Sequence, residues 1–131
     1  MTTPSPLRVL ISDDDPMIRD ALREVLEAEP DFEVVAVAGD ADEAIALTRA
    51  HDPAVAVLDV RMPGGGGPRA AREIRELSPA TRIVAFSAYG DSVALEEMRR
   101  LGVTEYLQKG VPNTEIVAAV RRLGSTTGQA S

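Results

Sequence analysis

The residues best suited to chemistry in this sequence lie far apart along the chain, yet each follows or closes a short apolar run. They comprise three consecutive carboxylates, one further carboxylate, a hydroxyl group and an ammonium group. In chain order they are Asp13, Asp14 and Asp15, then Asp59, Ser87 and Lys109. Two carboxylates about 4 Å apart repel each other by roughly 4 kcal/mol at an effective dielectric constant near 20. A converging group of this kind therefore requires a proton or a cation.

A hard divalent cation with oxygen ligands is the natural partner for such carboxylates. Mg²⁺ fits best, with Mn²⁺ as its substitute, because Mg²⁺ keeps several waters and commonly bridges carboxylates to phosphate. A carboxylate beside the metal can act as a nucleophile and form an aspartyl phosphate, while the metal and a lysine balance the developing charge. If the side chains converge, we expect phosphoryl chemistry.

The ammonium group of this set stands out, because Lys109 is the sole lysine among 14 basic residues. A primary ammonium on a flexible stem can follow a charge that moves. A planar guanidinium is wider and prefers a fixed bidentate partner. The chemistry of the site therefore gives a reason for one lysine in an arginine-rich chain.

The elements that must position these residues alternate regularly. Five apolar runs rich in β-branched residues predict strands at 8–13, 33–38, 55–59, 82–87 and 103–108. Helical patterns separate and follow them. They run from Pro16 to about Ala28 after an N-cap at Asp15, from the capping-box pair Asp40 and Glu43 to about Ala50, from Pro68 to Leu77, from a cap at Asp91 to Gly102, and from a cap at Asn113 to Gly124.

This pattern is (βα)5 and predicts an α/β fold, in which helices cover both faces of a parallel sheet. Five strands can be doubly wound in the order 2-1-3-4-5, although the pattern alone leaves the order open. Ligands in such folds bind at the carboxyl ends of the strands, near the switch between the first and third strands. Those ends carry Asp13, Asp14, Asp15, Asp59, Ser87 and Lys109.

Composition limits the class of protein. A chain of 131 residues with 44% apolar residues is long enough for one domain with its own core, predicted over 7–124. Residues 1–6 and the polar segment 125–131 are expected to be flexible termini, the latter a tail or the start of a linker. A net charge of -7 argues against direct nucleic-acid binding. The N-terminus does not resemble a signal peptide and no apolar run could span a membrane, so the expected location is cytoplasmic.

Four segments in order resemble a known family. ISDDDP, VLDVRMPGGGG, FSAYGD and EYLQKG are similar to the receiver domain of two-component response regulators, over residues 7 to about 123. The resemblance implies the CheY-like, flavodoxin-like arrangement with strand order 2-1-3-4-5. It implies that Asp59 is the phosphoacceptor. Asp14 would bind Mg²⁺ directly and Asp13 mainly through water, and Arg61 would contribute its backbone carbonyl.

The same resemblance implies a switch. Lys109 would pair with Asp59 before phosphorylation and with the phosphoryl oxygens afterwards. Ser87 would move to hydrogen-bond the phosphoryl group, and Tyr106 would turn inward into the vacated space. The fourth helix, fifth strand and fifth helix would carry the altered surface.

The motifs are most like receivers of the NarL/FixJ type, whose relatives carry a C-terminal helix-turn-helix domain that binds DNA. The implied partners are a sensor histidine kinase, such an effector domain in a longer protein, and a second copy on phosphorylation. The chain is then expected to be a signalling domain and not an enzyme, apart from its own phosphorylation and dephosphorylation. No organic cofactor is implied.

Other functions compete with this interpretation. A haloacid-dehalogenase-like phosphatase would use Asp13 as nucleophile and Asp15 as acid and base, but Pro16 follows at once and an acidic pair after Lys109 is missing. A flavodoxin-like FMN site would need a phosphate-binding loop where the aspartates stand. A phosphorylation-independent interaction module is a third possibility. Identifying the phosphorylated residue separates them.

Overall fold

The fold follows the predicted alternation of strands and helices. The computed structural model describes residues 5–88 and 90–127. Its elements are β1 (Leu7–Ser12), α1 (Pro16–Glu27), β2 (Phe32–Ala38), α2 (Ala41–His51), β3 (Val55–Asp59), α3 (Gly66–Leu77), β4 (Arg82–Ser87), α4 (Ser92–Arg100), β5 (Glu105–Gln108) and α5 (Asn113–Thr127). The strands form one parallel sheet in the order β2-β1-β3-β4-β5. The predicted fold class and strand order are confirmed.

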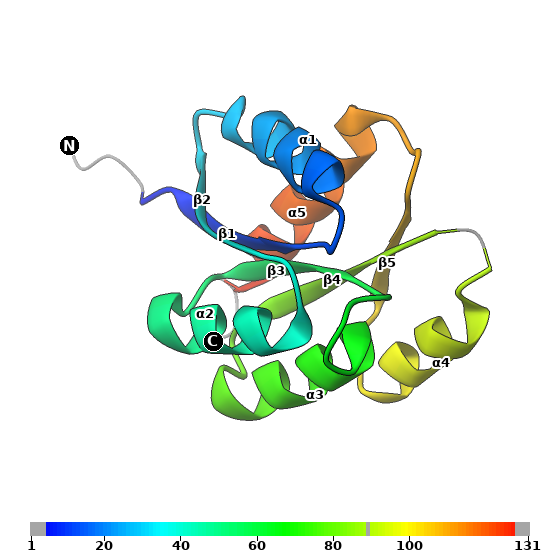
Figure 1. The fold of residues 1–131 in the computed structure, drawn as a ribbon. Coiled ribbons are helices and arrows are strands. Elements are labelled where there is room, and N and C mark those ends of the chain that lie inside the picture. The colour runs from blue at the N-terminus through cyan, green and yellow to red at the C-terminus, as the bar shows by residue number, and fades with distance from the viewer. Residues whose placement is uncertain (1–4, 89, 128–131) are drawn as a thin grey trace.

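Helices cover both faces of the sheet, with α1 and α5 on one side and α2, α3 and α4 on the other (Figure 1). Two apolar cores result. One contains Val9, Ile11, Val57 and Phe86, and the other contains Leu10, Leu58, Ala85 and Met98. Neighbouring residues of a strand point to opposite faces, so a central strand must be apolar throughout. All five residues of β3 are buried, including Asp59 at its end.

Two predicted caps form as expected. Asp15 accepts a hydrogen bond from the Met17 amide at 2.9 Å, and Asp40 accepts one from the Glu43 amide at 2.7 Å. Each bond satisfies one of the free amides at the start of a helix. The start of α1 fixes the direction in which the chain leaves β1, and with it the position of the acidic residues.

The last helix does not end where the sequence predicted. It runs through Gly124 to Thr127, so the predicted end at Gly124 is wrong, and residues 125–127 of the expected flexible terminus are helical. A Cβ atom on Gly124 would lie 2.5 Å from side-chain carbons of Leu7, which indicates that this glycine serves close packing and not a helix stop. Residues 128–131, the remainder of that expected terminus, lie outside the described residues.

The four consecutive glycines do not all lie in a loop before Pro68, where the sequence predicted that the third helix begins. Helix α3 begins two residues earlier, and Gly66 and Gly67 are buried. Added Cβ atoms would lie 2.8 Å from the carbonyl oxygens of Val60 and Asp59 respectively. These two glycines therefore let α3 start directly against the backbone that carries Asp59. Strand β5 is shorter than predicted, beginning at Glu105.

Candidate functional site

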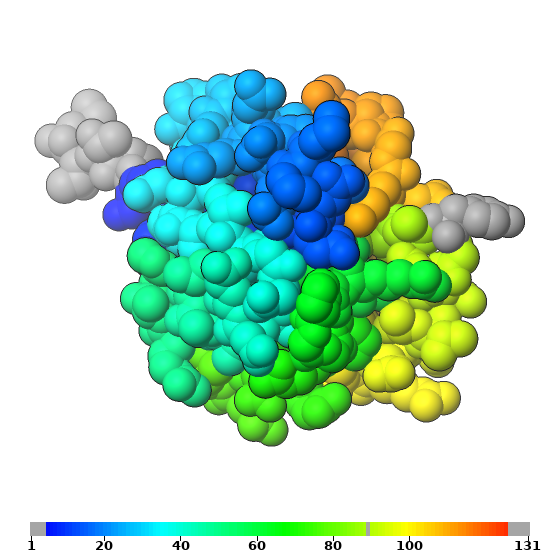
Figure 2. Space-filling view, viewed as in Figure 1, coloured from blue at the N-terminus to red at the C-terminus, as the bar shows by residue number. Residues whose placement is uncertain are grey.

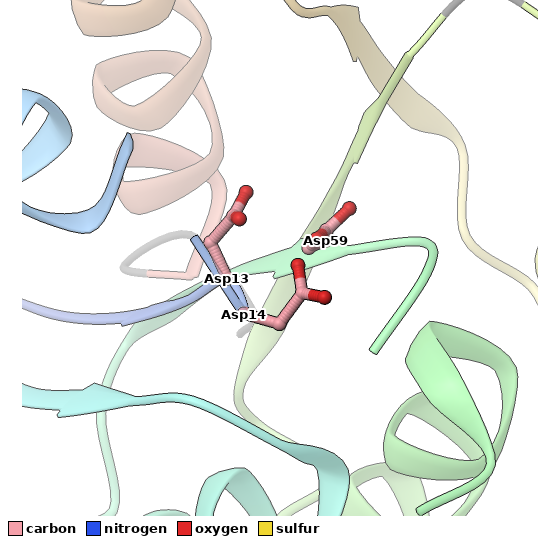
Figure 3. A group of neighbouring side chains, drawn as sticks. All are labelled: Asp13, Asp14 and Asp59. Carbon is pink, nitrogen blue, oxygen red and sulfur yellow. The ribbon is translucent and has the colours of Figure 1, made fainter. Parts of the chain in front are cut away.

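Three carboxylates from two neighbouring strands meet at the edge formed by the carboxyl ends of the strands, called the carboxyl edge below. Asp13 and Asp14 follow β1, and Asp59 closes β3 (Figure 3). One oxygen from each lies within 4.8 Å of the others. Asp13 and Asp59 are buried and Asp14 is exposed. The convergence expected from the strand ends is therefore observed, because parallel strands bring their carboxyl ends to one edge.

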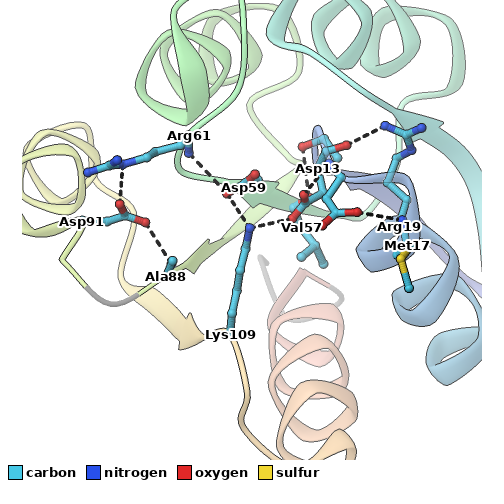
Figure 4. Close-up of polar contacts among 11 residues, drawn as sticks. Asp13, Met17, Arg19, Val57, Asp59, Arg61, Ala88, Asp91 and Lys109 are labelled. Carbon is cyan, nitrogen blue, oxygen red and sulfur yellow. Dashed lines mark hydrogen bonds and ion pairs between the residues drawn. The ribbon is translucent and has the colours of Figure 1, made fainter.

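Lys109 reaches this group from the chain that follows β5 (Figure 4). Its backbone amide donates a hydrogen bond of 2.8 Å to the carbonyl of Ser87, which fixes the start of the side chain beside β4. Its Nζ lies 2.9 Å from Asp13 Oδ2 and 3.2 Å from Asp59 Oδ1. The sequence predicted Asp59 as its partner but not Asp13. The cation bridges both buried carboxylates.

Burial disfavours the charged forms of both Lys109 and Asp59. It acts to lower the pKa of Lys109, but hydrogen bonding and attraction from Asp13 and Asp59 outweigh it, so that the pKa is raised and the ammonium form is favoured. For Asp59, burial and then the charge of Asp13 raise the pKa to about 7, against the opposing effects of Lys109 and the Arg61 amide. One lysine does not compensate both carboxylates.

The carboxylates retain capacity for a further partner. Asp59 Oδ2 is buried and accepts no hydrogen bond from the described residues, and Asp13 Oδ2 has only its ion pair with Lys109. Buried polar atoms normally have a hydrogen-bonding partner. The combination of oxygen donors, net negative charge and an unpaired buried oxygen fits a hard divalent cation.

Ser87 and Tyr106 lie on the strands next to this group. Ser87 ends β4 and is 5% exposed, and it follows Phe86, which pairs with Asp59 in the sheet register. Tyr106 lies in β5, with its hydroxyl group donating to the Val103 carbonyl. Its ring borders a hollow of about 350 Å³ that Leu95, Glu96 and Arg99 of α4 also line. Burial raises the pKa of Tyr106.

A second polar group, which sequence analysis missed, flanks Asp59 on the side of α4. The Arg61 amide donates to Asp59 Oδ1 at 3.3 Å, while the Arg61 side chain extends away from the carboxylates to Asp91 (Figure 4). Its Nε lies 2.5 Å from Asp91 Oδ1, and Asp91 Oδ2 accepts from the Ala88 amide at 2.9 Å. The sequence predicted Asp91 as the N-cap of α4, and it occupies that position without a side-chain cap bond.

The chain between β3 and α3 thus links the acidic group to α4. In the space-filling view, this bright green segment lies at the surface between the blue α1 and the yellow α4 (Figure 2). Of the three aspartates only Asp14 is exposed at this edge, whereas Asp59 is only 2% exposed.

Comparison with known proteins agrees with this geometry. Residues 9–121 match the response regulator receiver domain family. The protein named transcriptional regulatory protein NarL in Mycobacterium tuberculosis is 35% identical over 122 residues, which are 92% of this chain and 56% of that protein. YxjL of Bacillus subtilis, named an uncharacterized transcriptional regulatory protein, is 35% identical over 115 residues, or 88% of this chain and 53% of YxjL.

Solved structures give the same result. The signal receiver domain of the response regulator NarL from M. tuberculosis superposes with a TM-score of 0.87 at 34% identity, covering 93% of this chain and 98% of that one. The present chain belongs to the response regulator receiver domain family. Domains of this family act in phosphorylation-controlled signalling and are not enzymes in the usual sense.

The chain spans about half the length of the curated relatives it matches. Among residues 5–88 and 90–127, no helix combines the length and the apolar character needed to cross a membrane.

Proposed function

We propose that Asp59 accepts a phosphoryl group from the phosphohistidine of a sensor kinase, and that the charge added there switches the surface formed by α4, β5 and α5. The observation that carries the proposal is Asp59 Oδ2, which is buried close to Asp13, Asp14 and Lys109 and has no hydrogen-bond partner within the described part of the chain. A buried carboxylate with a free oxygen at the mouth of a parallel sheet is a suitable nucleophile.

The residues proposed to hold Mg²⁺ or Mn²⁺ are Asp13, Asp14 and Asp59, together with the backbone carbonyl of Arg61. When bound, the cation would supply charge that stabilises the equatorial oxygens of the transferring phosphoryl group. Asp14 is exposed and offers a direct ligand, whereas Asp13 is tied to Lys109 and is proposed to act mainly through water.

In the transfer step, a carboxylate oxygen of Asp59 forms the new oxygen–phosphorus bond as the bond from phosphorus to the donor breaks. The imidazole nitrogen of the kinase histidine, or the carboxylate of an acyl phosphate, leaves with the bonding electron pair. Lys109 Nζ, 3.2 Å from Asp59 Oδ1, then shifts its hydrogen bonds to the phosphoryl oxygens. The Ser87 hydroxyl group donates a hydrogen bond to the same phosphoryl group.

The movement of Ser87 leaves space that Tyr106 is proposed to occupy by turning inward from its bond to the Val103 carbonyl. The hollow lined by Leu95, Glu96 and Arg99 lies beside that path. The change alters the α4-β5-α5 surface, a two-state element biased by a local charge.

For the longer protein of which this domain would form part, the relatives named as transcriptional regulators suggest a C-terminal helix-turn-helix domain and control of transcription in the cytoplasm. Dimerisation of the phosphorylated form is part of this proposal. The domain is proposed to cover residues 7–124 together with the last turn of α5.

Incubation with Mg²⁺ and acetyl phosphate tests the central step. We expect wild type to gain the mass of one phosphoryl group, in an adduct that hydroxylamine removes. Asp59→Asn should gain none, because an amide oxygen is a poor nucleophile.

Asp20→Asn is the matched control, since Asp20 is an exposed carboxylate on α1, and it should react as wild type does. Peptide mapping identifies the modified residue. Modification of Asp13 would favour the phosphatase, and a folded wild-type protein that gains no mass would favour the phosphorylation-independent interaction module.

A further inference from the structure

Asp91 is a cap residue that does not cap. Among the helices that the structure describes, α1, α2 and α4 have an aspartate at the N-cap position, and in α1 and α2 the side chain accepts from a backbone amide of the first turn. In α4 the Asp91 side chain makes no such bond. Since an N-cap bond normally stabilises a helix, the side chain must be held by something that competes with the helix.

Two groups hold it, and both belong to loops that flank Asp59. Arg61 stands two residues after Asp59, and its Nε lies 2.5 Å from Asp91 Oδ1. Ala88 directly follows Ser87, and its amide donates to Asp91 Oδ2 at 2.9 Å. The pair is asymmetric, because the Asp91 side chain is 2% exposed and the Arg61 side chain is 73% exposed. The carboxylate is buried while most of the Arg61 side chain is exposed to solvent.

A phosphoryl group on Asp59 would compete directly with Asp91 for these donors. It carries a charge of about -1.5 to -2 near neutral pH and three acceptor oxygens. The Arg61 amide already donates to Asp59 Oδ1, so the guanidinium has its backbone anchor beside the new charge. Attraction would draw the exposed guanidinium away from Asp91, and repulsion would act on the Asp91 carboxylate. A buried carboxylate without its cation raises the free energy of the folded protein, so the Asp91 side chain would move to accept hydrogen bonds from other donors.

We infer that Asp91 is a resting-state latch. It ties the loop after β3 to the loop after β4, and phosphorylation of Asp59 opens it, freeing Asp91 to cap the first turn of α4. This inference rests on the proposed function of Asp59. It adds a route by which charge at Asp59 reaches α4 that is separate from the route through Ser87 and Tyr106.

We call the protein with a phosphoryl group or its analogue at Asp59 the loaded state. By thermodynamic linkage, a substitution that opens the latch must favour this state. The probe is beryllofluoride with Mg²⁺, a phosphoryl analogue that binds a carboxylate oxygen, titrated into the protein and followed by NMR. Asp91→Asn loses the charge pair but keeps a good N-cap side chain. We expect it to bind the analogue about 5-fold more tightly or better.

Glu97→Gln is the matched control, because it removes one exposed negative charge from the same helix. Its affinity for the analogue should stay within twofold of that of wild type, because an exposed charge is screened by solvent and salt. Titrations at raised ionic strength should preserve the difference between the two variants. Equal affinities of Asp91→Asn and wild type would overturn the latch.

Hydrogen exchange of the Val93 and Ala94 amides provides a readout that a merely structural role would not move. These amides should gain protection in wild type when the analogue binds, keep that gain in Asp91→Asn and lose it in Asp91→Ala. Absence of the gain in loaded wild type would refute the capping step. Failure of wild type to bind the analogue, or binding by Asp59→Asn, would instead refute the proposed function.

Discussion

The two edges of the sheet treat buried polar groups in opposite ways. At the carboxyl edge, a buried oxygen of Asp59 has no hydrogen-bond partner among residues 5–88 and 90–127. At the amino edge, where the strands begin, Ser78 donates to Asp52 at 2.6 Å and Thr81 donates to the Pro53 carbonyl at 2.6 Å, with the two hydroxyl oxygens 2.7 Å apart. Every hydroxyl of this second group has a partner within the chain.

This difference distinguishes a polar group that stabilises the fold from one that is suited to binding a partner. A satisfied buried network joins the ends of α2 and α3 to the starts of β3 and β4 and adds to stability. Buried carboxylates left partly unpaired reduce stability, and such groups mark sites that await a partner. If the proposed function holds, the carboxyl edge is the place where buried carboxylates reduce stability and serve the reaction.

The largest expected effect concerns the cation of the carboxyl edge. Lys109→Ala should slow phosphorylation of Asp59 by acetyl phosphate about 100-fold, because removing one donor to a developing oxyanion typically costs that much. Lys109→Arg should also be slow, since a guanidinium cannot follow the moving charge as an ammonium does. Initial rates from mass spectrometry measure both.

Arg8→Ala provides the control from the amino edge, where Arg8 donates to the His51 carbonyl. It should leave the rate unchanged. A wild-type rate in Lys109→Arg would contradict the explanation given for the sole lysine of the chain.

The next largest effect is on the free energy of unfolding. A substitution at the carboxyl edge should raise it, and a substitution at the amino edge should lower it. The pKa of Asp59 is raised to about 7 from 3.8. Between these values the folded protein holds more protons than the unfolded chain, so the free energy of unfolding falls as pH rises. At pH 8 without metal, Asp59→Asn should therefore stabilise the protein by about 2 kcal/mol, as expected on removing a poorly paired buried group.

Thr81→Val should instead destabilise the protein by about 2 kcal/mol, because it leaves the Pro53 carbonyl without its hydroxyl donor. Urea unfolding of both variants tests the contrast. Destabilisation by Asp59→Asn would show that the carboxylate is better compensated than its surroundings indicate.

The smallest effect is the pH dependence of metal affinity. A bound cation requires deprotonated ligands, and Asp59 passes from mostly protonated to mostly ionised between pH 6 and pH 8. The apparent affinity for Mg²⁺ should rise about 10-fold over this interval. Titration calorimetry measures it, and Asp59→Asn should flatten the dependence. An affinity that falls with rising pH would contradict the assignment.

The strands, the caps and the acidic group could be predicted because each depends on local signals. Runs of β-branched residues gave β3 and β4 with their observed bounds, and cap residues located the starts of α1 and α2. Asp13, Asp14 and Asp59 followed from the rule that parallel strands bring their carboxyl ends together. The end of α5 was wrong because Gly124 resembles a helix stop until Leu7 is seen against it.

The sequence alone therefore determined the order of elements, the edge where the acidic side chains meet and the residue types gathered there, because periodicity and strand ends are encoded locally. Only the tertiary structure decided which donors and acceptors meet. Lys109 lies beside Asp13 as well as Asp59, and the Asp91 side chain binds Arg61 instead of capping its own helix. Contacts between residues 30 to 96 positions apart depend on how loops are held in space, and no local pattern in the chain specifies that.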